Sequence, residues 1–133
     1  MTNQNQKITP LLMFNGNAEE AIKFYASIFN NAHIESILHQ ENGTVMHATF
    51  TLHGQTFMAI DNGNENDIHP FTAAFSLCVS CETEQEIDTV FKKLAKDGKI
   101  LMDLGPTPFS VKFAWIEDQY GVSWQLNLEG EKL

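Results

Sequence analysis

A histidine and an aspartate in one strand-like part of the sequence have the side chains best suited to catalysis. His47 lies in the run VMHATFTL, and Asp61 ends the run QTFMAID. Imidazole titrates near neutral pH, so His47 is a candidate general acid or base, or else a hydrogen-bonded polar residue on an open sheet face. Asp61 could orient that imidazole or act as a base itself; equally, it could cap the turn that Asn62 and Gly63 begin.

Two cysteines have the spacing of redox and zinc sites. Cys78 and Cys81 form a C-x-x-C within FSLCVSCE, a run that is typical of a strand. Three residues of extended chain place the two Cα atoms about 10 Å apart, beyond the reach of a disulfide. A zinc site would also need a second pair of Cys or His ligands. We therefore interpret both cysteines as small strand residues.

The composition restricts the kind of partner that the protein can have. A chain of 133 residues has the usual size of one domain and is too short for two independent cores. It has 8 Lys and Arg against 17 Asp and Glu, and the formal charge of −9 would repel nucleic acid. No apolar run approaches the roughly 18 residues of a membrane span, and the N-terminus does not resemble a secretory signal. We expect a cytoplasmic protein with neither a nucleic-acid nor a membrane partner.

The elements that would position these residues follow the same order twice. The first module, about 8–61, has one amphipathic helix among four strand-like runs, and the second, about 73–128, repeats it after a polar linker, 62–72. The expected strands are 8–14, 33–40, 44–53 and 56–61, then 73–81, 99–104, 110–117 and 122–128. Shifting the chain by 65 residues places Ile22 on Ile87. This self-similarity predicts two equivalent modules within a single domain.

Each predicted helix begins at a capping sequence. Asn17 and Glu20 have the spacing of a capping box before the first helix, and Thr83 and Glu86 have it before the second. Gly98 is a suitable residue to end the second helix. The order within each module is therefore one strand, one helix and three further strands.

This order predicts an α+β fold. Two β-α-β-β-β modules would form a curved mixed sheet around a cleft, with the helices on the outer face. One helix cannot cover four strands alone, so the core needs the other module or another subunit beside it, and we expect a homodimer. The hollow face of such a sheet is the natural place for a small-molecule ligand.

Strand alternation selects the side chains that would face the cleft. In the strand 44–53, Met46, Ala48, Phe50 and Leu52 are expected under the helix, and Val45, His47, Thr49 and Thr51 toward the cleft or solvent. In the last strand the cleft set is Ser123, Gln125 and Asn127, and in the first strand Phe14 is a candidate for the cleft floor. The two-proline loop 105–110 is expected to form a lip, and both Trp115 and Trp124 are expected in the core.

Three strings in the sequence resemble a known family. LLMFNGNAEEAIKFYASIF (11–29), VMHATFTLHGQTFMAID (45–61) and DQYGVSWQL (118–126) are similar to the PhnB-like branch of the vicinal oxygen chelate superfamily, whose members are also labelled demethylubiquinone methyltransferase-like. The superfamily includes glyoxalase I, bleomycin-binding proteins and extradiol dioxygenases. The resemblance implies the paired β-α-β-β-β fold, but a fold alone assigns no chemistry.

The resemblance also implies positions for a divalent metal. Active members hold it with one side chain from each of four strands, and these positions fall here on Pro10, on Ala59 or Asp61, on Ala74 or Ser76, and on Gln125. A metal needs three or four converging donors, and this set supplies about two. We therefore expect no metal centre and no cofactor.

Three hypotheses for the function remain open. The first is a protein that sequesters a small molecule without a metal, with Phe14, Thr49, Ser76, Ser123 and Gln125 contacting the ligand. The second is an enzyme of isomerase, lyase or transferase type that uses His47, Asp61 and Gln125. The third is an interaction module whose dimer surface is its function. No G-x-G-x-x-G follows a strand into a helix, so the sequence gives no sign of a cofactor cradle for a methyltransferase.

Overall fold

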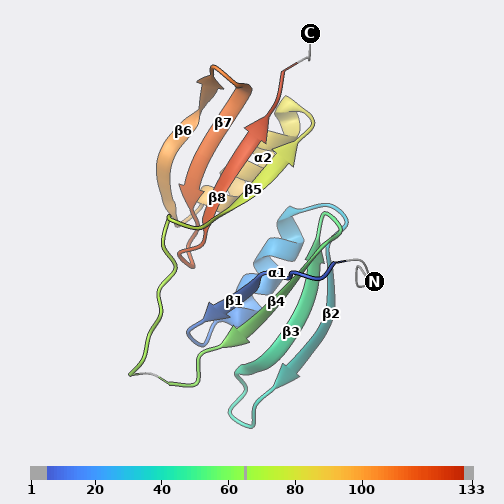
Figure 1. The fold of residues 1–133 in the computed structure, drawn as a ribbon, viewed down its shortest axis with the longest axis vertical. Coiled ribbons are helices and arrows are strands. Elements are labelled where there is room, and N and C mark those ends of the chain that lie inside the picture. The colour runs from blue at the N-terminus through green and yellow to red at the C-terminus, as the bar shows by residue number, and fades with distance from the viewer. Residues whose placement is uncertain (1–5, 65, 131–133) are drawn as a thin grey trace. The chain divides into compact units, whose positions relative to one another are not determined.

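The chain forms two compact units of the same construction. The computed structural model describes residues 6–64 and 66–130, and it divides between His69 and Pro70. Each unit contains four strands and one helix (Figure 1).

The first unit is a mixed four-stranded sheet with one helix. Its elements are β1 (Leu11–Phe14), α1 (Ala18–Ile28), β2 (His33–His39), β3 (Val45–Leu52) and β4 (Gln55–Asp61). The strands lie in the order β1-β4-β3-β2, with β1 parallel to β4 and the other neighbours antiparallel. α1 packs against β2, β3 and β4 and covers one face of the sheet (Figure 1).

The second unit repeats this topology. Its elements are β5 (Ser76–Cys81), α2 (Glu84–Ala95), β6 (Lys99–Thr107), β7 (Ser110–Glu117) and β8 (Ser123–Leu128). The order is β5-β8-β7-β6, β5 is parallel to β8, and α2 packs on one face. The predicted α+β fold of two β-α-β-β-β modules is therefore confirmed.

Each helix is held by the apolar stripe that the sequence predicted. Ile22 and Ile87, which the internal repeat places on each other, are both fully buried. Tyr25 and Val90, the next pair along the repeat, are 0% and 4% exposed. Burial of such side chains contributes about 1.5–3 kcal/mol each, so packing against the sheet, more than helix propensity, stabilises α1 and α2.

The two helices begin with different caps. Thr83 Oγ1 accepts a hydrogen bond from Glu86 N at 3.0 Å, so the predicted cap of α2 is confirmed. The side chain of Asn17 makes no capping hydrogen bond, so the predicted box at α1 is wrong. Asp61 of β4 takes its place, because Asp61 Oδ1 accepts from Ala18 N at 3.0 Å.

A bulge in β3 changes the faces of two residues. Leu38 pairs with His47 and His39 pairs with Val45, so Met46 has no partner on β2. The extra residue reverses the alternation at this end of β3. Val45 is 1% exposed and Met46 is 48% exposed, the opposite of the predicted faces, whereas Ala48, Phe50 and Leu52 are buried as predicted.

The loop predicted at 105–110, which contains two prolines, is shorter in the structure. β6 extends to Thr107 and β7 begins at Ser110, and these two residues pair, so only Pro108 and Phe109 lie outside the strands. Proline lacks an N–H, but β6 is an edge strand and needs no donor on its outer side. The segment is therefore the tip of a β-hairpin.

Candidate functional site on the open sheet faces

Each sheet has one face that its helix does not cover, and some of the candidate residues lie on these open faces. In the first unit the open face carries His47 and Thr49 of β3, and Thr49 pairs with Met58 of β4. His47 and Thr49 are both half-buried. Across the described ranges 6–64 and 66–130, no hydrogen bond, ion pair or ring contact involves the side chain of His47. Its imidazole is therefore accessible to a molecule placed on this face, and its role as an acid or base stays a prediction.

Asp61 lies on the opposite, helix-covered face. Ala48 pairs with Ala59, both are fully buried, and Asp61 shares the strand parity of Ala59. Since His47 has the other parity, the prediction that Asp61 orients its imidazole is wrong.

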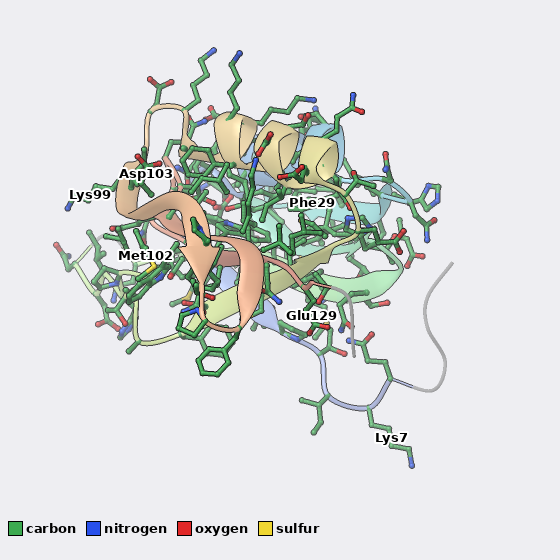
Figure 2. All side chains as sticks on the ribbon, turned by 90° about the horizontal axis from the view of Figure 1, so that it is seen from above. Lys7, Phe29, Lys99, Met102, Asp103 and Glu129 are labelled. Carbon is green, nitrogen blue, oxygen red and sulfur yellow. The ribbon has the colours of Figure 1, made fainter. Side chains whose placement is uncertain are left out.

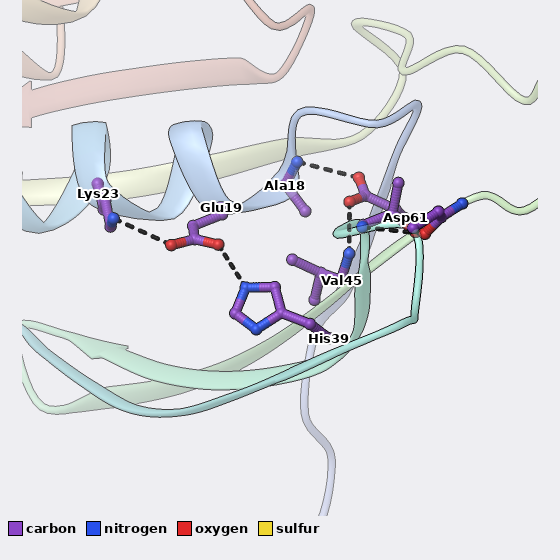
Figure 3. Close-up of polar contacts among 8 residues, drawn as sticks. Ala18, Glu19, Lys23, His39, Val45 and Asp61 are labelled. Atoms are coloured by element: carbon purple, nitrogen blue, oxygen red, sulfur yellow. Dashed lines mark hydrogen bonds and ion pairs between the residues drawn. The ribbon is translucent and has the colours of Figure 1, made fainter.

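The carboxylate of Asp61 is held by backbone donors instead. Oδ1 accepts from Gly16 N at 2.9 Å and from Ala18 N at 3.0 Å, and Oδ2 accepts from Val45 N at 2.8 Å (Figure 3). These bonds join β4 to the start of α1 and the start of β3. The alternative that Asp61 caps the Asn62 turn is also replaced, because the turn it stabilises is the one that leads into α1.

A second polar group links α1 to the sheet near Asp61. Glu19 accepts from His39 Nε2 at 2.6 Å and pairs with Lys23 Nζ at 2.9 Å (Figure 3). The hydrogen bond from His39, followed by that from Lys23, lowers the pKa of Glu19 below its ordinary value. This group is solvent-exposed, so it has the character of a surface ion pair.

In the second unit, strand alternation places the predicted polar set on the open face. Trp124, Leu126 and Leu128 are buried, whereas Gln125 and Asn127 are half-buried on the other side of β8. Gln125 lies between Cys78 of β5 and Trp115 of β7 in the sheet. No hydrogen bond to the Gln125 amide comes from any residue that the structure describes.

Two serines near Gln125 form a hydrogen-bonded group with the Trp115 indole. The hydroxyl groups of Ser76 and Ser123 are hydrogen-bonded at 2.7 Å, and Trp115 Nε1 donates to Ser123 Oγ at 2.8 Å. Ser123 is 1% exposed, so its hydroxyl positions the Trp115 indole and presents little surface of its own. Ser76 is half-buried at the edge of the same group.

Trp115 is the residue of this face that our sequence interpretation missed. We expected both tryptophans in the core; Trp124 is 2% exposed there, but Trp115 is half-buried on the open face. A signal was available, because Ala114 and Ile116 are apolar neighbours that must share the opposite face. Phe14 is the converse error: it is 1% exposed on the core face with Leu12, so it offers no surface to a ligand.

A hollow of about 540 Å³ lies at the end of this open face. Met102, Phe109 and Phe113 supply apolar surface, and Ser110, Asn127 and Glu129 supply polar groups. Phe109 at the hairpin tip is 88% exposed. The predicted lip therefore borders a concave surface within the second unit, and its closure over a ligand stays a prediction.

The cysteines occupy the extended strand that the sequence predicted. Cys78 is exposed and Cys81 is buried, and both are free thiols in β5. Burial, followed by the nearby charge of Glu86, raises the pKa of Cys81 to about 12. The Cys81 thiol is therefore uncharged and unreactive at neutral pH.

Comparison with protein families identifies the family of this chain. The family model described as 3-demethylubiquinone-9 3-methyltransferase matches residues 6–127. The chain belongs to this family. Its resemblance to the PhnB-like branch, seen in the three sequence strings, is thereby confirmed.

Solved structures place this 3-demethylubiquinone-9 3-methyltransferase family member among glyoxalase-like folds. A PhnB protein from Bacillus cereus, itself described by the same methyltransferase name, is 59% identical, over 92% of this chain and 99% of that chain, with a TM-score of 0.86. Protein PA1353 from Pseudomonas aeruginosa is 27% identical, over 96% and 100%, with a TM-score of 0.85. A glyoxylase/bleomycin resistance protein/dioxygenase domain from Frankia is 16% identical, over 96% and 100%, with a TM-score of 0.69, which shows the fold alone. Curated proteins give no match.

The positions that the resemblance assigns to metal ligands carry few side-chain donors in this family member. Pro10, Ala59 and Ala74 have no donor atom, and the Asp61 carboxylate accepts three backbone N–H groups. Gln125 supplies only a neutral amide. Within the described part of the chain, no three His, Cys, Asp or Glu side chains gather closely enough to hold a metal ion. The residues present do not fit the usual divalent metal site.

A helix that spans a membrane must be long and apolar. Neither α1 nor α2, the helices of the described residues, is long and apolar enough to cross a bilayer.

Proposed function

We propose that this protein binds a small organic molecule on the open face of its second sheet, without a metal centre. The observation that carries the proposal is the half-buried Gln125 amide, which has no hydrogen-bond partner among the described residues and lies beside the Trp115 indole. A polar group in a partly apolar setting gains free energy when a ligand supplies the missing hydrogen bonds. An aromatic wall with a few fixed polar groups is the usual composition of a small-molecule site.

The surrounding residues support a preformed site. Ser123 Oγ accepts from Trp115 Nε1 and is hydrogen-bonded to the Ser76 hydroxyl, so the indole is fixed before a ligand arrives. A wall that is already ordered loses little side-chain entropy on binding. Thr49 of the first unit is a further candidate contact on its own open face.

The donor set supports binding without a metal. Of the superfamily positions, Pro10, Ala59 and Ala74 have no side-chain donor, the alternative Ser76 supplies a hydroxyl that is hydrogen-bonded to Ser123, and Asp61 is engaged by the backbone on the helix-covered face. We propose that ligand polar atoms are met by the Gln125 amide and hydroxyl groups in place of a cation. Metal analysis after purification without chelators should find less than stoichiometric Zn, Ni, Mn or Fe.

An enzyme is the second candidate, and one observation favours it. The His47 imidazole is half-buried on an open face with no partner in the described part of the chain, as a general acid or base requires. The family name and that of the Bacillus cereus relative denote methyl transfer. In such a reaction His47 would take a proton from the accepting hydroxyl group, and the methyl donor would need a site that the sequence motifs do not reveal.

A thermal-shift screen tests the proposed function. Thiol conjugates, aromatic antibiotics and phosphonates are suitable compound classes, each measured with and without a chelator. A compound at about 100 times its Kd stabilises the folded state by about 2.7 kcal/mol, which raises Tm by several degrees. A chelator-insensitive shift is the expected result.

The same screen separates the alternatives. Turnover of the stabilising compound, lost in folded His47→Ala protein, would select the enzyme over the sequestering protein. The absence of any stabilising compound would contradict both and favour the interaction module.

A further inference from the structure

The hollow at the end of the second sheet has a lining that discriminates between ligand charges. It lies between the β6–β7 hairpin and the end of β8, and its lining includes Met102 and Glu129. Figure 2 labels both residues, Met102 on β6 and Glu129 just after β8. Its volume of about 540 Å³ is sufficient for a molecule of drug-like size. The charge that it presents is the carboxylate of Glu129.

The Glu129 carboxylate has no internal partner in the described part of the chain. No hydrogen bond or ion pair of Glu129 is made with residues 6–64 or 66–130. Lys112 of β7 donates to Asp88 Oδ1 at 2.9 Å, and its Nζ lies 3.6 Å from Glu84 Oε1. Both acidic residues are on α2, so Lys112 belongs to the helix-covered face. The negative charge at the hollow is therefore available to a ligand.

The other polar groups of the hollow are already engaged with each other. The Ser110 hydroxyl donates to Asn127 Oδ1, and Thr107 Oγ1 accepts from Phe109 N at 3.2 Å. The Asn127 amide N–H and the Thr107 hydroxyl hydrogen remain as neutral donors, so the charged group that a ligand meets beside the apolar surface is the Glu129 carboxylate. A carboxylate favours a ligand with a positive charge.

The aromatic rings add to this preference. Phe109 and Phe113 border the hollow, and ring faces attract an ammonium group within about 6 Å of the centroid. The formal charge of −9 on the chain also attracts cations from solution.

We propose, on the basis of the binding function above, that this hollow takes an organic cation: a protonated amine with an aromatic or aliphatic body. The ammonium group pairs with Glu129, and the body packs against Met102, Phe109 and Phe113.

Three small probes test the proposal. 2-Phenylethylamine, 2-phenylethanol and 3-phenylpropanoate share one aromatic body and carry positive, zero and negative charge at pH 7. Each is titrated into ¹⁵N-labelled protein, and amide shifts are followed at 107–113 and 127–130. The amine should shift these amides with an affinity about tenfold above that of the alcohol, corresponding to one ion pair with cation–π support. The propanoate should bind more weakly than the alcohol.

Two variants and a control identify the residues responsible. Glu129→Gln should lower the amine affinity to that of the alcohol and leave alcohol binding unchanged. Glu41→Gln removes the same charge from an exposed turn of the first unit and should change neither. Phe109→Ala should weaken amine binding about threefold to tenfold, and because Phe109 is 88% exposed, the variant should remain folded.

The results separate this inference from the proposed function. Equal affinity for amine and alcohol, or an unchanged amine affinity in Glu129→Gln, overturns the charge preference and leaves binding on the open face intact. Shifts confined to amides around Gln125 also overturn this inference while supporting the proposed function. No shift with any of the three probes contradicts the hollow as a cation site, whatever the compound screen returns.

Discussion

At the residue scale, the most informative side chain is Asp61, because its type suggested catalysis and its contacts indicate a structural role. One carboxylate accepts three backbone N–H groups from two separate segments, near Gly16 and at Val45. Hydrogen bonds to a charged acceptor are stronger than neutral ones, and their loss leaves backbone donors of a helix start unsatisfied.

Removal of Asp61 is therefore expected to cost stability. Asp61→Ala should lower the free energy of unfolding by about 2–4 kcal/mol, measured by urea denaturation. Asp103→Ala is the matched control, because exposed Asp103 accepts only from the adjacent Leu104 N, and its change should stay within about 0.5 kcal/mol. A loss of similar size in both variants would contradict the capping role.

The two thiols should differ in reactivity. Because burial raises the pKa of Cys81 to about 12, only about one molecule in 10⁴ carries the thiolate there at pH 8. An aromatic disulfide reagent should modify exposed Cys78 rapidly and Cys81 only as the pH approaches that pKa or the protein unfolds. Fast modification of both thiols in the folded wild-type protein would contradict the burial of Cys81.

At the element scale, the Ser76, Ser123 and Trp115 group joins three strands of the second sheet. Ser123→Ala should leave the Trp115 Nε1 donor and the Ser76 hydroxyl without this partner. We expect a loss of about 1–3 kcal/mol in urea denaturation and a shift of tryptophan fluorescence. Ser80→Ala, at an exposed position of β5, should alter neither quantity. An unchanged fluorescence spectrum in Ser123→Ala would count against an indole positioned by this hydroxyl.

The elements themselves were largely predictable from sequence because their signals are local. Alternation in β8 and the helical spacing of Ile22 and Ile87 depend on neighbours within a few residues, and both predictions agree with the burial observed. In β3, Ala48, Phe50 and Leu52 are buried as predicted for the same reason, whereas Thr51, expected toward the cleft or solvent, is 2% exposed.

The errors arise where a distant segment determines the structure. The bulge at Met46 is defined by the pairing of β3 with β2. Val45 and Met46 are both apolar, so the alternation of the sequence gives no sign that their faces are reversed. The cap of α1 comes from Asp61, 43 residues away from Ala18, while Asn17 offered a plausible local substitute. The position of Trp115 on the open face was predictable from its neighbours Ala114 and Ile116. Only the general tendency of tryptophan to be buried argued against it.

At the scale of the whole molecule, duplication explains why one short chain carries two open sheet faces. Each unit buries one face of its sheet under a single helix. The fold follows from this architecture and the family from the match over residues 6–127, whereas the ligand depends on a few side chains that the architecture leaves variable.

The homodimer stays a prediction, and it is readily measured. Edge strand β6 exposes Ile100, Leu101 and Met102 by 51%, 40% and 47%, apolar surface of the kind that subunits cover. Light scattering after size-exclusion chromatography should give about twice the chain mass of 15.0 kDa. An Ile100→Lys variant should weaken association, and a wild-type mass equal to one chain would contradict the dimer.

The central claim is binding on the second open face without a metal, and calorimetry tests it most directly. The most stabilising compound of the screen is titrated into untreated protein, chelator-treated protein, Gln125→Ala and the exposed control Gln55→Ala. We predict equal affinity for the first two and the control, and a loss of about tenfold or more in Gln125→Ala. Binding that disappears with the chelator and returns with a divalent metal, or that is unchanged in Gln125→Ala, would contradict the account.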